Sequence, residues 1–281
     1  MQTDTQVQDK LIEVRGLSFH YREWGNAGLP PVLIFHGITG HAWEFDQLAS
    51  ALSCSFHVLV ISQRGHGASS WAAQYSPHTM AEDIAGLIDA FGFERVRIIG
   101  HSMGGVNSWI YAATHPEKLD RLVLQDITPD VITSDDVVAG MTMILREYAQ
   151  AHYADPQEAV SWYMSGSKKS NPGKLREFVL KNLASSSEGI YTWRFDAKGL
   201  QGWIKSASSD PEMHWSALRK IVCPALVVRA GNSHFTGRNS VERMVQALPN
   251  GLQVEIPGST HDIHIERCEE LVETLCRFLT E

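Results

Sequence analysis

One serine of this chain stands in a turn whose neighbours favour nucleophilic chemistry. A stretch rich in β-branched residues (96–99) leads into Gly100-His101-Ser102-Met103-Gly104, a G-x-S-x-G pattern, and a helical pattern follows. In such a strand-to-helix turn the serine adopts a strained backbone conformation, and the glycines remove Cβ atoms that would collide with neighbouring backbone. Ser102 is therefore the candidate nucleophile. The alternative interpretation is a glycine-rich turn with an ordinary exposed serine.

A serine hydroxyl needs a general base in order to react at neutral pH, and histidine is the natural one. The carboxyl ends of parallel strands converge on one crevice, so we look for the base just after a strand. His261 follows the last predicted strand in a Gly/Ser-rich loop, and we predict that it is the base. His234 and His264 are less favourably placed. His36, which precedes a glycine, is interpreted as a structural group.

Two backbone amides are candidates for an oxyanion hole. Met103 begins the helix that follows the serine, and unpaired N–H groups at a helix N-terminus favour a negative oxygen. The segment His36-Gly37-Ile38 follows another buried strand, and its glycine allows the backbone to fold back toward the serine. We therefore predict that the amides of Ile38 and Met103 form the hole.

The elements that must position these groups alternate between strands and helices. Continuous apolar runs predict strands that are covered on both faces, whereas the first two strands alternate in the manner of an edge hairpin. Strands are expected at 11–15, 17–24, 31–35, 57–61, 95–99, 122–126, 224–229 and 252–256, and helices at 43–52, 79–91, 104–114, 238–248 and 265–279. The predicted fold class is α/β, with a mostly parallel eight-stranded sheet and helices on both of its faces.

This alternation is lost between residues 128 and 210. Helical patterns at 135–153, 156–164 and 174–184 are joined there by Ser/Gly/Pro/Asn-rich segments. We interpret 128–210 as an inserted helical cap without a sheet of its own, on a core formed by 1–127 and 211–281. Its aromatic and thioether side chains are suited to lining an apolar pocket, although each of them could equally hold the cap to the core. The expected pocket residues are His101, Met141, Trp162 and Trp193.

Composition and charge exclude several classes of function. The net charge is −8, with 24 basic against 32 acidic residues, which argues against a nucleic-acid partner. Residues 1–10 lack the apolar core of a signal peptide and no uncharged apolar run approaches about 18 residues, so we expect a cytoplasmic protein with no membrane partner. The histidines and the four cysteines show no metal-ligand spacing, so no metal or cofactor is expected. The expected partner is a small-molecule ester or amide, and a homodimer is left open.

Four spaced motifs together resemble the α/β-hydrolase family. They are the His36-Gly37 loop, the Gly65-His66-Gly67 loop, the serine pentapeptide and the Gly258-Ser259-Thr260-His261 segment, and they span almost the whole chain in family order. The resemblance implies that Ser102 is the nucleophile, that His261 is the base, and that the amides of Ile38 and Met103 form the oxyanion hole.

The acid is where this sequence departs from the common family pattern. Most members place an aspartate shortly after the strand predicted here at 224–229, but residues 231–236 read Gly-Asn-Ser-His-Phe-Thr without a carboxylate. Asp126 stands at the other position that the family uses, the end of the strand after the nucleophile helix. Its Asp-Ile-Thr-Pro context resembles the (E)-2-(acetamidomethylene)succinate hydrolase subgroup, whose acid occupies this position. Asp126 is the predicted acid, and Asn232 and Asp130 are the alternatives.

The expected reaction is the hydrolysis of a carboxylic ester, as in a carboxylesterase, through an acyl-enzyme on Ser102. Amide, lactone and carbon–carbon bond hydrolysis on the same fold are alternatives. A non-catalytic homologue that binds a small molecule under the cap, and a cofactor-free perhydrolase or oxygenase, are two further ones. Relatives that carry out dehalogenase or epoxide hydrolase chemistry need an aspartate in place of Ser102, so those activities are not expected.

Overall fold

An eight-stranded sheet forms the centre of the computed structural model, which describes residues 7–165 and 172–281. The strands lie in the order β1-β2-β4-β3-β5-β6-β9-β10, and the six strands from β4 to β10 in that order run parallel. β1 and β2 form the antiparallel edge. The strands are β1 (Gln8–Val14), β2 (Leu17–Trp24), β3 (Pro31–Phe35), β4 (His57–Ile61), β5 (Val96–His101), β6 (Leu119–Gln125), β9 (Ala225–Ala230) and β10 (Gly251–Ile256). The predicted mostly parallel eight-stranded sheet is confirmed.

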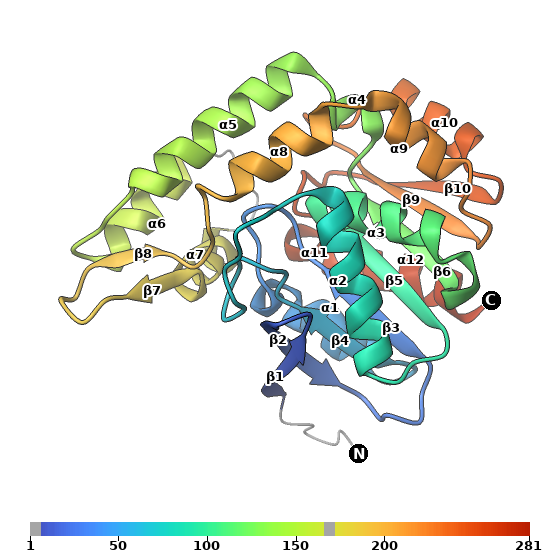
Figure 1. Cartoon of the computed structure of the whole chain (residues 1–281), viewed down its shortest axis with the longest axis horizontal. Coiled ribbons are helices and arrows are strands. Elements are labelled where there is room, and N and C mark those ends of the chain that lie inside the picture. The colour runs from blue at the N-terminus through green and yellow to red at the C-terminus, as the bar shows by residue number, and fades with distance from the viewer. Residues whose placement is uncertain (1–6, 166–171) are drawn as a thin grey trace.

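Helices cover both faces of this sheet (Figure 1). Successive residues of β3 point to opposite faces, so Leu33 enters one hydrophobic core and Ile34 the other. The first core is completed by α2 (Pro77–Ala90), α3 (Met103–Thr114), α9 (Pro211–Leu218) and α10 (Arg238–Ala247). The second is completed by the 3₁₀ helix η1 (Ala42–Phe45), α1 (Asp46–Leu52) and α12 (Cys268–Thr280). Strand interiors are therefore apolar on both sides, as the continuous apolar runs predict.

The segment between β6 and α9 leaves the sheet and covers the carboxyl ends of its strands (Figure 1). It contains α4 (Pro129–Ile132), α5 (Asp135–Gln150), α6 (Pro156–Ser165), α7 (Pro172–Lys181), β7 (Leu183–Ser185), β8 (Tyr191–Trp193) and α8 (Leu200–Ser208). The division into a core of 1–127 and 211–281 and a cap of 128–210 stays an interpretation. None of the helices in the described ranges has the length and apolar character needed to span a bilayer.

The structure corrects three expectations about this chain. A short antiparallel pair, β7 with β8, occupies part of the region for which no sheet was expected. The helix predicted at 174–184 stops before Asn182, whose side chain donates to the Thr39 carbonyl 2.7 Å away. Strands β7 and β8 have three residues each, which is too few to show an alternating pattern, and their pairing depends on the turn between them. The helix predicted at 265–279 is interrupted at Arg267, which separates α11 (Ile263–Glu266) from α12.

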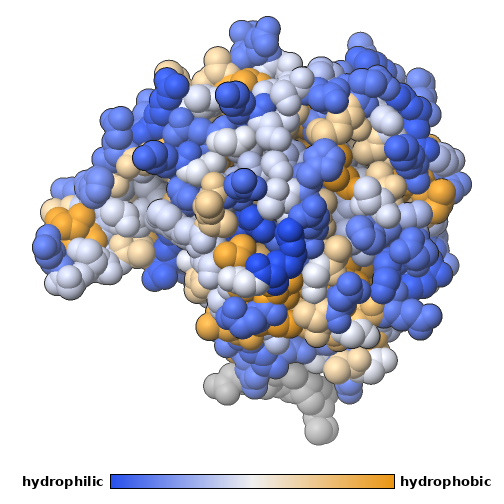
Figure 2. All heavy atoms as spheres, viewed as in Figure 1, coloured by the Kyte–Doolittle hydropathy of each residue, from blue (hydrophilic) through white to orange (hydrophobic). Residues whose placement is uncertain are grey.

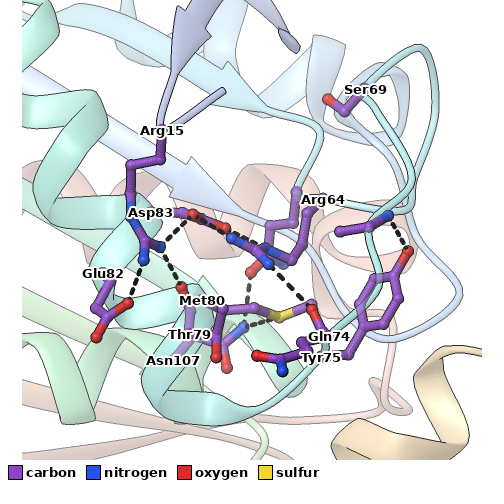
Figure 3. Close-up of polar contacts among 12 residues, drawn as sticks. Arg15, Arg64, Ser69, Gln74, Tyr75, Thr79, Met80, Glu82, Asp83 and Asn107 are labelled. Carbon is purple, nitrogen blue, oxygen red and sulfur yellow. Dashed lines mark hydrogen bonds and ion pairs between the residues drawn. The ribbon is translucent and has the colours of Figure 1, made fainter. Parts of the chain in front are cut away.

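The loop after β4 is anchored on α2 by a buried ion pair (Figure 3). Asp83 lies between Arg64 and Arg15, and it accepts hydrogen bonds from Arg64 Nη2 at 2.6 Å and from Arg15 Nη1 at 2.9 Å. Arg64 Nη1 also donates to the Gln74 carbonyl at 3.0 Å. The guanidinium therefore fixes the loop that carries Gly65 and His66 at the carboxyl end of the sheet.

Candidate active site

Ser102 occupies a sharp turn between β5 and α3. Its backbone has φ 50° and ψ −118°, a left-handed value of φ that is uncommon for a residue other than glycine. A Cβ on Gly100 would lie 2.6 Å from Gly105 Cα, and one on Gly104 would lie 2.3 Å from the Phe35 carbonyl oxygen. Both glycines are therefore required by the close approach of β5, α3 and β3. The turn has the geometry that the G-x-S-x-G pattern predicts.

His261 and Asp126 are brought together from positions 135 residues apart. His261 lies in the loop after β10 and Asp126 directly follows β6, with β9 between these two strands. The imidazole Nδ1 is 2.8 Å from the carboxylate Oδ2. Asp126 is 1% exposed and has a left-handed φ of 47°, which is a second strained position at this end of the sheet.

Three further donors surround the Asp126 carboxylate. The amide of Ala230 donates to Oδ1 at 3.1 Å, the Ser233 hydroxyl donates to Oδ2 at 2.7 Å, and the Thr236 hydroxyl donates to Oδ1. Burial raises the pKa of Asp126, but hydrogen bonds from His261, Thr236 and Ser233 outweigh it, and the net pKa lies below the usual value. The carboxylate is thus stabilised in its charged form.

Sequence reasoning missed Ser233 and Thr236. They stand in the segment where most family members place the acid, and here that segment donates hydrogen bonds to a carboxylate on the neighbouring strand. Their three-residue spacing was the available signal, because the Thr236 amide also donates to Ser233 Oγ at 3.0 Å and forms a local turn.

Asp130, one alternative to Asp126, is engaged elsewhere. It accepts from Ser240 Oγ at 2.6 Å and from Arg243 Nη1 at 3.1 Å, which ties it to α10. The backbone N–H of Asn232, the other alternative, donates to the Ser259 carbonyl at 2.8 Å. His36 is fully buried, and its ring contacts the Gly37 carbonyl through Nδ1 and the Gln63 amide through Nε2. These contacts give His36 the structural role expected for it.

The His36-Gly37-Ile38 segment lies directly against the serine turn. The Gly104 amide donates to the His36 carbonyl at 3.1 Å, and a Cβ on Gly37 would lie 3.4 Å from Ser102 Cβ. His66 Nε2 is 2.8 Å from the Ile38 carbonyl and holds this segment from the other side. Met103 is the first residue of α3, where an N–H group has no acceptor within the helix. Both proposed oxyanion residues line the same cavity as Ser102.

This cavity has a volume of about 750 Å³ and contains both Ser102 and His261. Helices α5 to α8 cover it with mainly apolar side chains, which include Met141, Ile144, Tyr148, Trp162, Tyr163, Phe178, Trp203 and Ile204. Acidic side chains at the wall are Glu44, Glu147 and Asp262, and the described wall contains no lysine or arginine. The face seen in Figure 2 is mixed, with hydrophilic residues interspersed with smaller apolar patches.

Of the expected pocket residues, His101, Met141 and Trp162 line the cavity and Trp193 does not. Trp193 is 4% exposed and lies behind the wall, where its ring meets Tyr148 edge-on at 4.9 Å between centroids. The side chain belongs to β8, whose pairing with β7 turns it into the core of the cap. His101 donates from Nε2 to the His261 carbonyl at 3.0 Å, and burial lowers its pKa well below the ordinary histidine value.

A parallel sheet that turns from β5 through a strained residue into α3, with the other motifs at the carboxyl ends of its strands, defines an α/β-hydrolase fold. The sequence profile described as alpha/beta hydrolase fold matches residues 30–267. The chain therefore belongs to the α/β-hydrolase family.

Individual relatives agree with this assignment. The chain is 27% identical to 2-(acetamidomethylene)succinate hydrolase of Mesorhizobium japonicum over 282 residues, covering 96% of this chain and 94% of the relative. It is 25% identical to Esterase YbfF of Escherichia coli over 261 residues, covering 89% of this chain and 93% of the relative. The crystal structure of E-2-(acetamidomethylene)succinate hydrolase superposes with a TM-score of 0.89 at 22% identity, over 98% of this chain and all of that one. The names of these relatives support a hydrolase activity for this chain.

Proposed function

We propose that this protein is a serine hydrolase that cleaves carboxylic esters through an acyl-enzyme on Ser102, with His261 as base and Asp126 as acid. The observation that carries the proposal is the 2.8 Å contact between His261 Nδ1 and Asp126 Oδ2 at the edge of a cavity that also contains the strained serine. A buried carboxylate on one ring nitrogen leaves the other nitrogen as the proton acceptor.

The reaction follows from these roles. His261 Nε2 takes the Ser102 hydroxyl proton while Oγ attacks the ester carbonyl, and the Ile38 and Met103 amides stabilise the resulting oxyanion. Collapse of the tetrahedral intermediate breaks the bond to the alcohol, which leaves with the proton from His261. A water molecule then repeats the sequence on the acyl-enzyme and releases the acid. Asp126 stays ionised and stabilises the imidazolium at each step.

The cavity wall favours an uncharged, apolar acyl group. Its charged members among the described residues are acidic, and a carboxylate-bearing substrate would therefore meet like charges in an apolar surrounding. Amide hydrolysis is a second candidate, because the Mesorhizobium japonicum relative is named as the hydrolase of an acetamido compound. That name refers to a succinate derivative, a class of substrate that this wall does not favour.

A panel of p-nitrophenyl esters of increasing chain length, compared with matched amides and lactones, tests the proposal. We expect turnover of the esters by the wild-type protein and its loss in Ser102→Ala. A fluorophosphonate probe should label the wild-type protein and leave Ser102→Ala unlabelled. No ester turnover together with no labelling would favour a non-catalytic binding protein. Labelling with turnover of amides alone would favour the second candidate.

A further inference from the structure

A buried cluster of three ligand-bearing side chains lies beside the serine turn and has no part in the proposed acyl transfer. Glu44 comes from η1, His101 from the end of β5 and His264 from α11. Each offers one ligand atom, and the three atoms lie within 4.8 Å of one another. Two of the three residues, Glu44 and His101, also line the catalytic cavity.

The nitrogens of this cluster lack ordinary partners. The His264 side chain is 1% exposed, and neither of its ring nitrogens is hydrogen-bonded to another described residue. Its Nε2 lies 3.7 Å from Glu44 Oε1, which is too long for a hydrogen bond. His101 Nδ1 is also buried without a hydrogen-bond partner in the described ranges. Buried polar atoms are normally satisfied, so unpaired nitrogens gathered at one point indicate a missing partner.

The hydrogen bond made by His101 Nε2 fixes the tautomer of the ring. Nε2 is 3.0 Å from the His261 carbonyl, which can only accept, so Nε2 carries the hydrogen. Nδ1 of the neutral ring then keeps its lone pair, and it is the ring atom left to bind an ion. A histidine ligand whose second nitrogen donates to a carbonyl is the usual arrangement at metal sites. The His264 ring is also held in place, since it stacks on Phe45 with centroids 4.1 Å apart.

We propose that Glu44, His101 and His264 bind a divalent transition-metal ion, for which Zn²⁺ is the best match. Two imidazoles and one carboxylate are ligands that Zn²⁺ accepts, and three protein ligands leave a fourth position open. That position faces the cavity, because Glu44 and His101 belong to its wall. Bonds of about 2.0–2.2 Å require the ligand atoms to draw together from their present separation, and small side-chain rotations achieve this.

Occupancy should inhibit hydrolysis, a consequence that rests on the proposed function. The His101 ring lies 4.6 Å from the His261 ring between centroids. An ion on His101 therefore lies beside the proposed base, and the fourth ligand that it holds toward the cavity takes up space next to Ser102 and His261. The histidine spacing in the sequence predicts no metal site, because these ligands come from three distant segments that meet only in the fold.

Calorimetric titration of the chelator-treated protein with ZnCl₂ tests the site directly. We expect one Zn²⁺ per chain, and a dissociation constant at least about 100-fold weaker in Glu44→Gln and in His264→Gln, since even outer partners of a metal contribute 10–100-fold. His152→Gln, at an exposed histidine of the cap, is the matched control and should bind as the wild type does. Co²⁺ should give visible absorption bands of a tetrahedral site that both cluster variants lose. Binding that is absent, or unchanged in both variants, would overturn the site.

An activity assay distinguishes Zn²⁺ binding at the cluster from the inhibition of hydrolysis that we expect it to cause. Each variant is compared with its own metal-free rate, and Zn²⁺ should inhibit the wild type and His152→Gln at concentrations that leave Glu44→Gln and His264→Gln active. Inhibition that persists in variants that no longer bind at the cluster would contradict the coupling and indicate an ion on His261 itself. If the protein hydrolyses no substrate, the proposed function fails while the titration still decides the site.

Discussion

Asp126 is stabilised in its charged form at a buried position because four hydrogen-bond donors converge on its two oxygens. Two of these donors come from the turn after β9, which supplies hydroxyls where most family members supply the acid. Moving the carboxylate to the end of β6 thus preserves the contact with His261, since β6 and β9 are neighbours in the sheet.

Asp126→Asn should reduce kcat by about 10³–10⁴-fold and should also lower the melting temperature, because the NH2 group of the asparagine faces donors that converge on the carboxylate. The amide keeps the shape of the side chain but no longer fixes the imidazole tautomer or stabilises the imidazolium. Steady-state kinetics on a p-nitrophenyl ester and a melting curve measure both effects. Asp130→Asn is the matched control and should retain turnover. Near-normal kcat in Asp126→Asn would remove Asp126 from the mechanism.

Ser233→Ala tests a positioning role for the hydroxyl beside this carboxylate. The Ser233 hydroxyl is one of the donors that lower the pKa of Asp126, so its removal raises the pKa of this carboxyl group and protonates it at higher pH. The acid limb of the pH–rate profile should therefore move to higher pH, so that activity is lost earlier as the pH falls. A profile of kcat/KM against pH measures the shift. An acid limb at the wild-type position would mean that the hydroxyl has only a structural role.

At the scale of elements, the site depends on loops that are anchored away from the chemistry. The loop after β4 supports the Ile38 segment through His66 and is itself fixed to α2 by Arg64 and Asp83. On the other side, the Glu266 side chain accepts from the Thr260 amide at 2.6 Å, which ties the loop of His261 to α11. The interruption at Arg267 leaves α11 as a separate short helix, and this helix supports the loop of His261.

Asp83→Asn should lower the free energy of unfolding by about 3–5 kcal/mol. The Arg64 and Asp83 side chains are only 6% and 5% exposed, and removing one partner leaves an uncompensated buried charge. Glu82→Gln, at the exposed pair of Glu82 with Arg15, is the control and should cost less than about 1 kcal/mol. Urea denaturation measures both variants. Equal losses in the two would contradict the importance assigned to the buried pair.

At the scale of the whole molecule, one cavity combines a mainly apolar lining with the proposed catalytic residues at its edge. Helices α5 to α8 place aromatic side chains in the wall of this cavity. The net charge of −8 and the acidic members of the wall have the same sign. Both features disfavour an anionic substrate.

The protein should therefore discriminate between esters of equal length that differ in terminal charge. We expect kcat/KM for a p-nitrophenyl ester with a neutral acyl chain to exceed that for its ω-carboxylate counterpart by at least about tenfold, because the wall leaves the charge unpaired. In Glu147→Gln the difference in kcat/KM between the two esters should be smaller, because one acidic side chain of the wall is then neutral. Equal values for both esters in the wild type would contradict the assigned preference.

The sequence by itself determined the features that depend on local sterics and periodicity. The glycines around Ser102 are required by close backbone approach, and apolar runs such as the one at 31–35 are required by burial on both faces, so each was visible in a few consecutive residues. For the triad, Ser102 was inferred from its turn and His261 from its place after the last strand, whereas Asp126 was inferred from the family resemblance; the triad remains a prediction.

Only the tertiary structure decided which distant groups meet. The hydroxyls of Ser233 and Thr236 face Asp126 because β9 lies beside β6, and Glu44 meets His264 because η1 and α11 pack together. The place of Trp193 behind the wall and the short pair of β7 with β8 also depend on long-range packing. Contacts of this kind leave no periodic trace in the chain, since their energy comes from segments that become neighbours only on folding.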